Sequence, residues 1–234
     1  MSIVTRRFLV MALMAGLGLA ACGDDEASQR KALIEFLRSR IVDKTGLHVP
    51  KPSEDEMKSF GPYAKDYGII LGFNDAMDKN ITAGMSQALG KGMPRSLADL
   101  TARRTDLASV MDGMRTIRAT LDAELAKADA AHAALKQPDD LESLYDKAYT
   151  RTVTTPATTV KEIFPAIDDI FEAAQNLVNF IDQHHDAIKI NGNSMQASDP
   201  KLLGELNGLI GSVTRNSQAL QEAQRKYQAV IGGY

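Results

Sequence analysis

Apolar side chains recur three and four residues apart through most of the chain after residue 28, and this spacing places them on one face of a helix. The first helix is predicted to begin at Ser28 and to end before Gly46 and the segment 50–52, which contains two prolines. The apolar face of this helix consists of Leu33, Phe36, Leu37 and Ile41.

A second helix is predicted to begin after Ser53, because Ser53 and Glu56 have the spacing of a capping box. Gly61-Pro62 interrupts its first turns, which predicts a kink or a false first turn. The helix is followed by a predicted loop at residues 90–94, which contain two glycines and a proline. Its apolar positions are Met57, Phe60, Ala64, Tyr67, Leu71, Met77 and Ile81.

Between Ser96, a predicted cap, and Leu135 the apolar pattern keeps a period of seven residues. One helix of about 39 residues, roughly 58 Å long, is therefore expected. It is either a long helix of an antiparallel bundle or a coiled coil that binds a partner, and the other amphipathic helices of the chain favour the bundle. The two seam positions hold Leu97, Arg104, Met111, Arg118, Leu125 and His132, and Leu100, Leu107, Met114, Leu121, Ala128 and Leu135.

A short helix is expected after Pro138, and it is followed by a predicted loop at residues 150–159, which are rich in β-branched residues and include Pro156. Thr159 and Glu162 then have the spacing of a capping box for a further helix. Pro165 is tolerated in that helix if it lies near the first turns. The apolar faces of the two helices consist of Leu141, Leu144, Tyr145 and Ala148, and of Ile163, Ile167, Ile170, Phe171, Ala174, Leu177, Val178 and Ile181.

The period changes from helical to alternating in residues 187–197, around Asn191-Gly192, and this change predicts a β-hairpin. Asp199 as a cap and Pro200 at the first helical position predict a last helix, which ends at Gly232-Gly233. Its apolar stripe consists of Leu203, Leu206, Ile210, Val213, Leu220, Tyr227 and Ile231.

The pattern and the composition together predict an all-α fold. The chain has no tryptophan, ten methionines and no internal repeat, and its core is expected to consist of aliphatic residues, alanine and methionine. The expected architecture is an elongated antiparallel helical bundle with one long central helix and a small β-hairpin before the last helix.

The first 22 residues have the organisation of a bacterial lipoprotein signal. Arg6-Arg7 precedes the apolar residues 8–21, and Leu19-Ala20-Ala21-Cys22 places small residues directly before a cysteine. We expect residues 1–21 to be removed as a signal peptide and Cys22 to carry the lipid. An uncleaved transmembrane helix is the alternative, but 14 residues rise only about 21 Å against a hydrocarbon core of about 30 Å.

After removal of the signal, residues 22–27 are expected to form an acylated tether and residues 28–234 a single helical domain. The formal net charge of the mature chain is about −5, because Arg6 and Arg7 account for two of the 27 basic residues, against 30 acidic ones. This acidic balance argues against nucleic acid as a partner. Cys22 is the only cysteine, so its acylation leaves no thiol for a disulfide.

The residue types that usually perform catalysis are sparse. His184 and His185 are adjacent and point about 100° apart on a helix, so they could bind zinc only weakly, with help from Asp182 and Asp186. The sequence contains no G-x-S-x-G, no phosphate-binding glycine loop and no C-x-x-C motif. We therefore expect no catalytic residue, no cofactor and no metal site.

Other charged residues are expected to serve the fold. Asp139-Asp140, Asp168-Asp169 and residues 54–56 lie at or near predicted helix starts, where negative charge stabilises the helix dipole. His132, Arg104 and Arg118 are expected at the edge of the long seam, where the arginines extend to solvent or pair with acids of a neighbouring helix.

Four groups of residues carry a resemblance to a known family: residues 29–37, residues 60–63 with Asp66-Tyr67, residues 128–144, and residues 153–157. Together they resemble the YiaF-like lipoproteins of enterobacteria, a family with a domain of unknown function (3053). The resemblance covers the chain from about residue 29 onward. It implies a small envelope lipoprotein without assigned catalysis, and it carries over no active-site residue.

The leading expectation is a non-catalytic periplasmic lipoprotein that binds another envelope component. The alternative is a binder of an apolar small molecule or lipid in a groove lined by Met57, Met77, Met111 and Met114. An enzyme, chiefly a metal hydrolase using His184 or His185, is the third possibility. Gly23, in place of an aspartate after the acylated cysteine, favours the periplasmic face of the outer membrane, with the inner membrane as the alternative.

Overall fold

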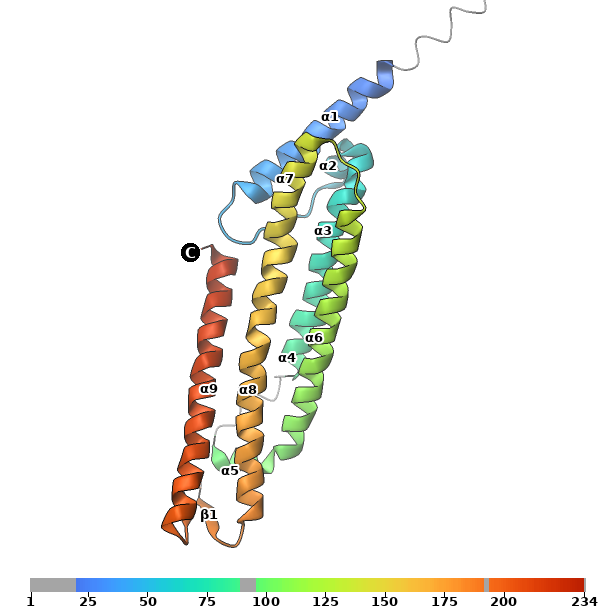
Figure 1. Cartoon of the computed structure of the whole chain (residues 1–234). Coiled ribbons are helices and arrows are strands. Elements are labelled where there is room, and N and C mark those ends of the chain that lie inside the picture. Colours follow the sequence, from blue (N-terminus) through green and yellow to red (C-terminus); the bar gives the residue numbers. More distant parts are fainter. Residues whose placement is uncertain (1–19, 89–95, 192–193, 234) are drawn as a thin grey trace, which may run out of the picture.

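The computed structural model describes residues 20–88, 96–191 and 194–233, which form a slender helical bundle (Figure 1). The predicted loop at residues 90–94 lies outside the described residues. In order, the elements are α1 Ala20–Leu37, η1 Arg38–Val42, α2 Glu54–Ser59, η2 Gly61–Tyr63, α3 Ala64–Ala76, η3 Met77–Thr82, α4 Ala83–Ala88, α5 Leu97–Ala102, α6 Arg104–Ala133, α7 Asp139–Tyr149, η4 Thr150–Thr154, α8 Thr155–Gln183, β1 Ile188–Asn191, β2 Ser194–Ala197 and α9 Pro200–Gly232.

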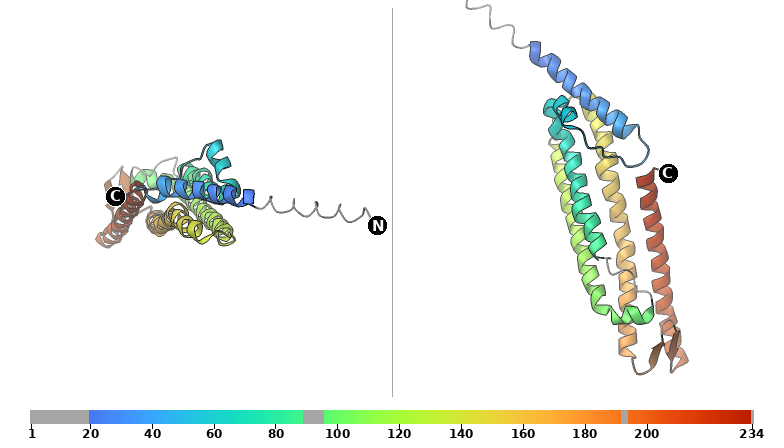
Figure 2. Two further views of the ribbon diagram at one scale, coloured as in Figure 1. Left: turned by 90° about the horizontal axis from the view of Figure 1, so that it is seen from above. Right: turned by 180° about the vertical axis from the view of Figure 1, so that it is seen from behind.

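Long helical segments lie side by side, and successive segments run in opposite directions (Figures 1 and 2). α3 continues through η3 into α4 and packs against α6, whereas α7 continues through η4 into α8, which contacts both α6 and α9. α1 crosses the end of the bundle where α2 and α7 begin, and the hairpin lies at the opposite end. The predicted elongated antiparallel bundle is therefore confirmed.

The hairpin before α9 is also confirmed. β1 and β2 are antiparallel, and the pairs Ile188 with Ala197, Ile190 with Met195, and Asn191 with Ser194 define the register. Ile188 is buried, and Ile190 and Met195 pack against the same apolar cluster at this end of the bundle. The turn residues 192–193, which include Gly192, lie outside the described residues.

α8 is the most buried helix of the described chain, and α9 is an outer helix. The apolar face of α8 is buried from Pro156 to Ile181, whereas Leu206 is the one buried residue among those described in α9. α9 covers chiefly α8, so only a narrow strip of its surface faces other side chains. The predicted stripe is wrong at Leu203, which is 37% exposed, because the neighbouring Leu202 contacts the core instead.

The start of the second helix follows the sequence signals closely. Ser53 accepts a hydrogen bond from the Glu56 amide, and the Glu56 carboxylate accepts one from the Ser53 amide, which completes the predicted capping box. Gly61 has a φ of 54° and opens a short 3-10 turn at the predicted interruption. The rings of Phe60 and Tyr67 then meet in the core, each edge-on to Phe36.

The predicted loop at residues 150–159 is wrong, because α7, η4 and α8 form one continuous helical segment. Threonine hydroxyls bond to the carbonyls four residues earlier, as Thr152 does to Ala148 and Thr159 to Thr155, so these polar groups are satisfied inside the helix. Thr159 is therefore not a cap, and Pro165 lies in the helix interior instead of its first turns.

The predicted helix over residues 97–135 is divided at Arg103, although Ser96 caps its start as expected. Arg103 has left the helical conformation, and its side chain pairs with Asp99 before the break and with Asp106 after it. In α6 the second seam position is buried at Met114, Leu121 and Ala128, whereas the first lies at the edge of the core. The seam is covered by helices of the same chain, as expected for a bundle.

Candidate functional site

Cys22, the expected lipid-attachment residue, lies near the start of α1, where only the backbone is described. The helix that we expected to begin at Ser28 begins at Ala20, so residues 22–27 continue the helix. Residues 1–19 of the predicted signal lie outside the described residues. Among the described helices, none combines the length and the apolar character needed to cross a membrane.

Polar contacts hold α1 on the body of the protein within a few residues of Cys22. The Tyr63 hydroxyl donates a short hydrogen bond to the Glu26 carboxylate, and Arg30 lies 3.6 Å from the Asp140 carboxylate at the start of α7. Burial, together with the bond to Glu26, raises the pKa of Tyr63 to about 12. The phenol therefore stays protonated and able to donate at neutral pH.

Apolar packing also attaches α1 to the bundle. The side chain of Gln29 lies against the backbone of Gly61, where a Cβ atom would collide with it. One turn further on, Leu33 and Leu37 are completely buried, and Phe36 is 6% exposed. α1 is thus part of the bundle from Glu26 onward, and it does not behave as a separate tether there.

A group of buried polar residues lies behind this attachment, where α3, α7 and the connection before α7 meet. Asp66 is 3% exposed, and its Oδ2 accepts a hydrogen bond of 2.6 Å from the Gln137 amide. The Tyr145 hydroxyl donates to the Asp66 main-chain oxygen, also at 2.6 Å. Burial raises the pKa of Tyr145 far above its ordinary value. The other carboxylate oxygen, Oδ1, is buried without a hydrogen-bond partner among the described residues.

His132 packs beside this group and not on a free surface. Its ring stacks on Tyr149 at 4.0 Å between centroids, and its Nε2 lies 2.8 Å from the Asp146 carboxylate. The Tyr149 hydroxyl donates to Asp129. These contacts join α6 to α7, so the arrangement serves helix packing, as expected for a polar residue at the seam edge.

Sequence reasoning missed the structural importance of Asp66, although Asp66-Tyr67 was part of the family resemblance. An acidic residue inside a predicted helix looks like an exposed surface residue, because aspartate is rarely buried. Its burial depends on Gln137, which lies 71 positions later in the chain. A local pattern contains no signal for that pairing.

The two adjacent histidines lie at the end of α8 and in the turn after it. His184 packs against Phe180, with 4.6 Å between ring centroids, while His185 contacts the Asp182 carbonyl through Nδ1 and the Asp186 carboxylate through Nε2. Within residues 20–88, 96–191 and 194–233, no group of three or more His, Cys, Asp or Glu side chains is arranged to hold a metal ion.

The acidic pairs occupy two different kinds of position. Asp139-Asp140 and residues 54–56 lie in the first turns of α7 and α2, as predicted. Asp168-Asp169 lies in the middle of α8, so the predicted helix start is wrong there. The prediction failed because the residues before Thr159 are helical as well, so α8 begins at Thr155 and Asp168-Asp169 lies far from its start.

The arginines on the seam form ion pairs with acidic residues of α8. Arg118 donates to Asp168 at 2.6 Å, and its guanidinium lies 4.9 Å from the centroid of the Phe164 ring. Arg104 donates to Asp182 at 2.8 Å. These exposed pairs join α6 to the antiparallel α8, so the predicted pairing with acids of a neighbouring helix is confirmed.

A groove of about 470 Å³ lies between the η3–α4 segment and α6, and its walls are mostly small or polar side chains. Asn80, Gly84 and Gln87 form one wall, and residues of α6 that include Val110 and Ile117 form the other. None of the four methionines that we expected to line a ligand groove is among the lining residues, and Met114 is a core residue with 2% exposure.

The geometry defines a class of protein: a slender helical bundle whose N-terminal helix is attached across one end. Comparison with known proteins identifies the family. The family described as "Protein of unknown function (DUF3053)" matches residues 9–228. "Uncharacterized protein YiaF" of Escherichia coli K12 is 30% identical over 216 residues, which cover 91% of this chain and 90% of that protein.

The proteins of the same name from Escherichia coli O157:H7 and Shigella flexneri show the same identity and coverage. The chain therefore belongs to the DUF3053 family, and the YiaF-like resemblance is confirmed. No solved structure matches the chain.

Proposed function

We propose that this chain is a lipid-anchored envelope protein, attached through acyl chains on Cys22, whose helical body binds another envelope component without catalysing a reaction. The observation that carries the proposal is the position of the only cysteine, directly after small residues at the end of an apolar, uncharged stretch. Several acyl chains on one residue hold a protein firmly, whereas one chain binds reversibly.

Metabolic labelling with an alkyne fatty acid tests the anchor. We expect label on the natural chain and none on Cys22→Ser, because serine lacks the thiolate that attacks the lipid donor. The Cys22→Ser chain should also stay unprocessed, held by its own apolar segment. A natural chain without label would contradict the proposal.

A binding role agrees with the absence of a recognisable reaction centre in the described part of the chain, where the buried polar residues serve helix packing. Mild crosslinking followed by affinity purification from detergent-solubilised membranes tests it. We expect a second envelope component at a reproducible ratio with the natural chain. Recovery of this chain alone would contradict a partner-binding role.

For location we propose the periplasmic face of the outer membrane, with the inner membrane as the alternative. Gly23 follows the expected acylated cysteine, and in enterobacteria-like sorting an aspartate at that place retains a lipoprotein in the inner membrane. Separation of the membranes on a sucrose gradient should show the natural chain with the outer membrane and Gly23→Asp with the inner membrane. The reverse distribution would contradict this assignment.

The alternative function is binding of an apolar small molecule or lipid. The groove beside α6 supports this alternative, because its lining includes the apolar residues Val110 and Ile117. Native mass spectrometry of a form without the anchor would then show a retained ligand, and a ligand-free mass would count against it.

A further inference from the structure

We propose that α1 holds the bundle end-on to the membrane, with the α2 and α7 end beside the lipid surface and the β1–β2 hairpin farthest from it. This orientation rests on the lipid anchor proposed above and deepens it. The end of the bundle crossed by α1 then faces the surface of the bilayer that holds the acyl chains of Cys22.

Only a short stretch of chain separates the expected anchor from the attached part of α1. Asp25 is three residues after Cys22, and even an extended chain of three residues spans at most about 11 Å. Asp25 accepts a hydrogen bond from Gln29, and the next residue, Glu26, accepts the bond from Tyr63. The end of the bundle therefore cannot move far from the acylated residue.

α1 is attached to two separate elements of the bundle, so it cannot swing as a hinged arm. Glu26 is bonded to Tyr63 in η2, and Arg30 is paired with Asp140 in α7. Leu33, which follows on α1, is completely buried. A rotation of α1 that preserved one of these contacts would break the others.

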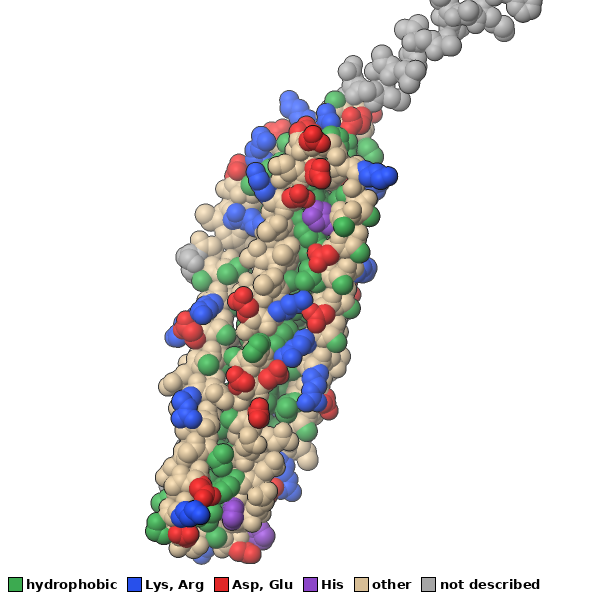
Figure 3. Space-filling view, in the orientation of Figure 1, with side chains coloured by type: hydrophobic (Ala, Val, Ile, Leu, Met, Phe, Trp, Pro, Cys, Tyr) green, Lys and Arg blue, Asp and Glu red, His purple; other side chains and the backbone are tan. Residues whose placement is uncertain are grey.

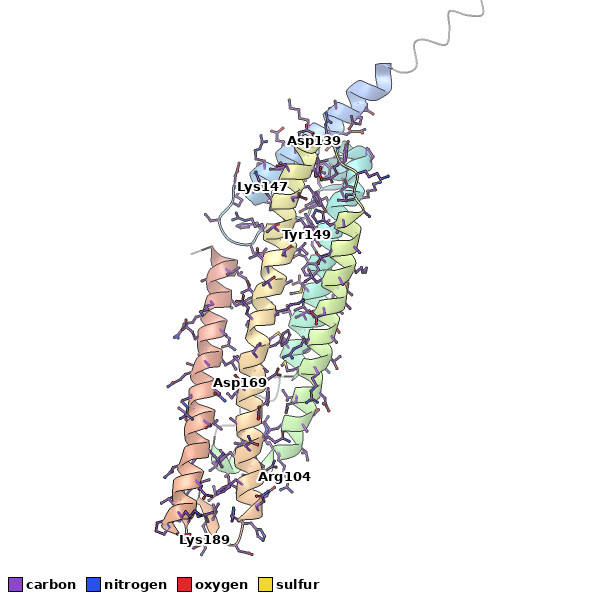
Figure 4. The ribbon with its side chains drawn as sticks, viewed as in Figure 1. Arg104, Asp139, Lys147, Tyr149, Asp169 and Lys189 are labelled. Atoms are coloured by element: carbon purple, nitrogen blue, oxygen red, sulfur yellow. The ribbon has the colours of Figure 1, made fainter. Side chains whose placement is uncertain are left out.

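The bundle is elongated, and α1 crosses one of its ends (Figure 1). Asp139 on α7 and Lys189 on β1 lie at opposite ends of the molecule (Figure 4). The continuous segment of α7, η4 and α8 between these ends spans about 65 Å at 1.5 Å per residue. Cys22 lies within about 11 Å of Asp25, and the next residue, Glu26, is bonded to the bundle, so the end crossed by α1 stays near the membrane. The hairpin at the other end could reach the lipid only if the whole long side of the bundle lay down on it.

On the face shown in Figure 3, charge does not favour the opposite arrangement, in which this long face lies on the membrane. Blue and red side chains are interspersed over the face in Figure 3, with hydrophobic side chains between the helices. That face presents no continuous basic patch to attract an anionic leaflet.

Energy transfer from the protein to labelled lipids tests the orientation. Cys22 is the only cysteine and would be acylated, so a single new cysteine gives a unique labelling site. Lys58→Cys on α2 and Lys189→Cys on β1 place a donor dye at exposed positions near the two ends. The full lipidated chain is placed in vesicles of phosphatidylethanolamine and phosphatidylglycerol that carry a headgroup acceptor. We expect severalfold greater transfer from residue 58 than from residue 189.

An insertion tests whether α1 causes the difference. A twelve-residue Gly-Ser segment between Gly23 and Asp24, which spans about 20 Å, should reduce the difference in transfer between the two positions. The same segment appended after Tyr234 should leave the difference unchanged. Circular dichroism verifies that each variant is folded. Equal transfer in the natural chain, or an unchanged difference after the insertion, would overturn the orientation. An intact mass without acyl chains would overturn the anchor itself, and the two failures are therefore distinguishable.

Discussion

The side-chain amide of Asn74 on α3 donates a hydrogen bond of 3.2 Å to the main-chain carbonyl of Thr152 in η4. Pro156, four residues after Thr152, has no N–H to offer that carbonyl. Thr152 is completely buried, so water does not replace the missing donor easily. A donor from another helix thus serves this carbonyl in the threonine- and proline-rich segment where α7 continues into α8.

Replacement of Asn74 by alanine is expected to lower the free energy of unfolding by about 1–3 kcal/mol, because a buried carbonyl loses its side-chain donor. In a Pro156→Ala background the same replacement should cost clearly less, since the introduced alanine restores a backbone N–H near that carbonyl. Urea denaturation of the four chains measures the coupling. Additive effects of the two replacements would contradict this role of Asn74.

Arg151 connects η4 to the turn after η1, and its loss should loosen the end of α9. Its guanidinium donates to the carbonyls of Val42, Lys44 and Gly46. Leu47, next in the turn, donates to the Ile231 carbonyl of α9 at 2.9 Å. We expect Arg151→Met to cost about 1–3 kcal/mol and to speed amide exchange in the last turns of α9.

Arg225→Met is the matched control, because Arg225 is exposed on α9 and pairs with Glu222 one turn away. Its cost should stay below about 0.5 kcal/mol. Similar exchange rates in the two variants would show that Arg151 does not order this turn.

Gly46 is required by its conformation and by its neighbours. Its φ is 73°, and a Cβ atom there would lie 2.7 Å from the Ile231 carbonyl oxygen. Gly46→Ala should therefore destabilise the fold by about 1–3 kcal/mol. Gly208→Ala, at an open position inside α9, should instead stabilise it by about 0.5–1 kcal/mol. Thermal unfolding of both variants checks the opposite signs.

Stability should decline at alkaline pH because of the tyrosines. Burial raises the pKa of Tyr67 and Tyr145 well above the ordinary value, and that of Tyr63 to about 12. The unfolded side chains ionise near pH 10. The folded state therefore keeps protons that the unfolded state loses, and this contribution is complete below about pH 10 and decreases as the pH rises above it.

The melting temperature is accordingly expected to fall between pH 9 and pH 11.5. Tyr63→Phe should make that fall smaller, because phenylalanine has no proton to lose. A natural chain with the same melting temperature at both pH values would contradict burial of these phenols.

The local pattern of the sequence determined most of the secondary structure. Ser53 with Glu56, Asp199 with Pro200, and the alternation around residue 191 act through neighbouring backbone groups, and the structure bears out each of them. Helical periodicity also identified the class of fold, since a stripe of apolar residues must be covered by another helix.

Tertiary structure decided what local patterns cannot encode. Residues 150–159 have a composition typical of a loop, yet Asn74 supplies a donor from α3 and the threonines bond within the helix. The buried Asp66 carboxylate accepts a hydrogen bond from Gln137, which lies in the connection between α6 and α7. The attachment of α1 to the bundle involves a distant partner in the same way, because Glu26 accepts its hydrogen bond from Tyr63. Contacts such as these join residues that are distant in sequence, and periodicity contains no information about such partners.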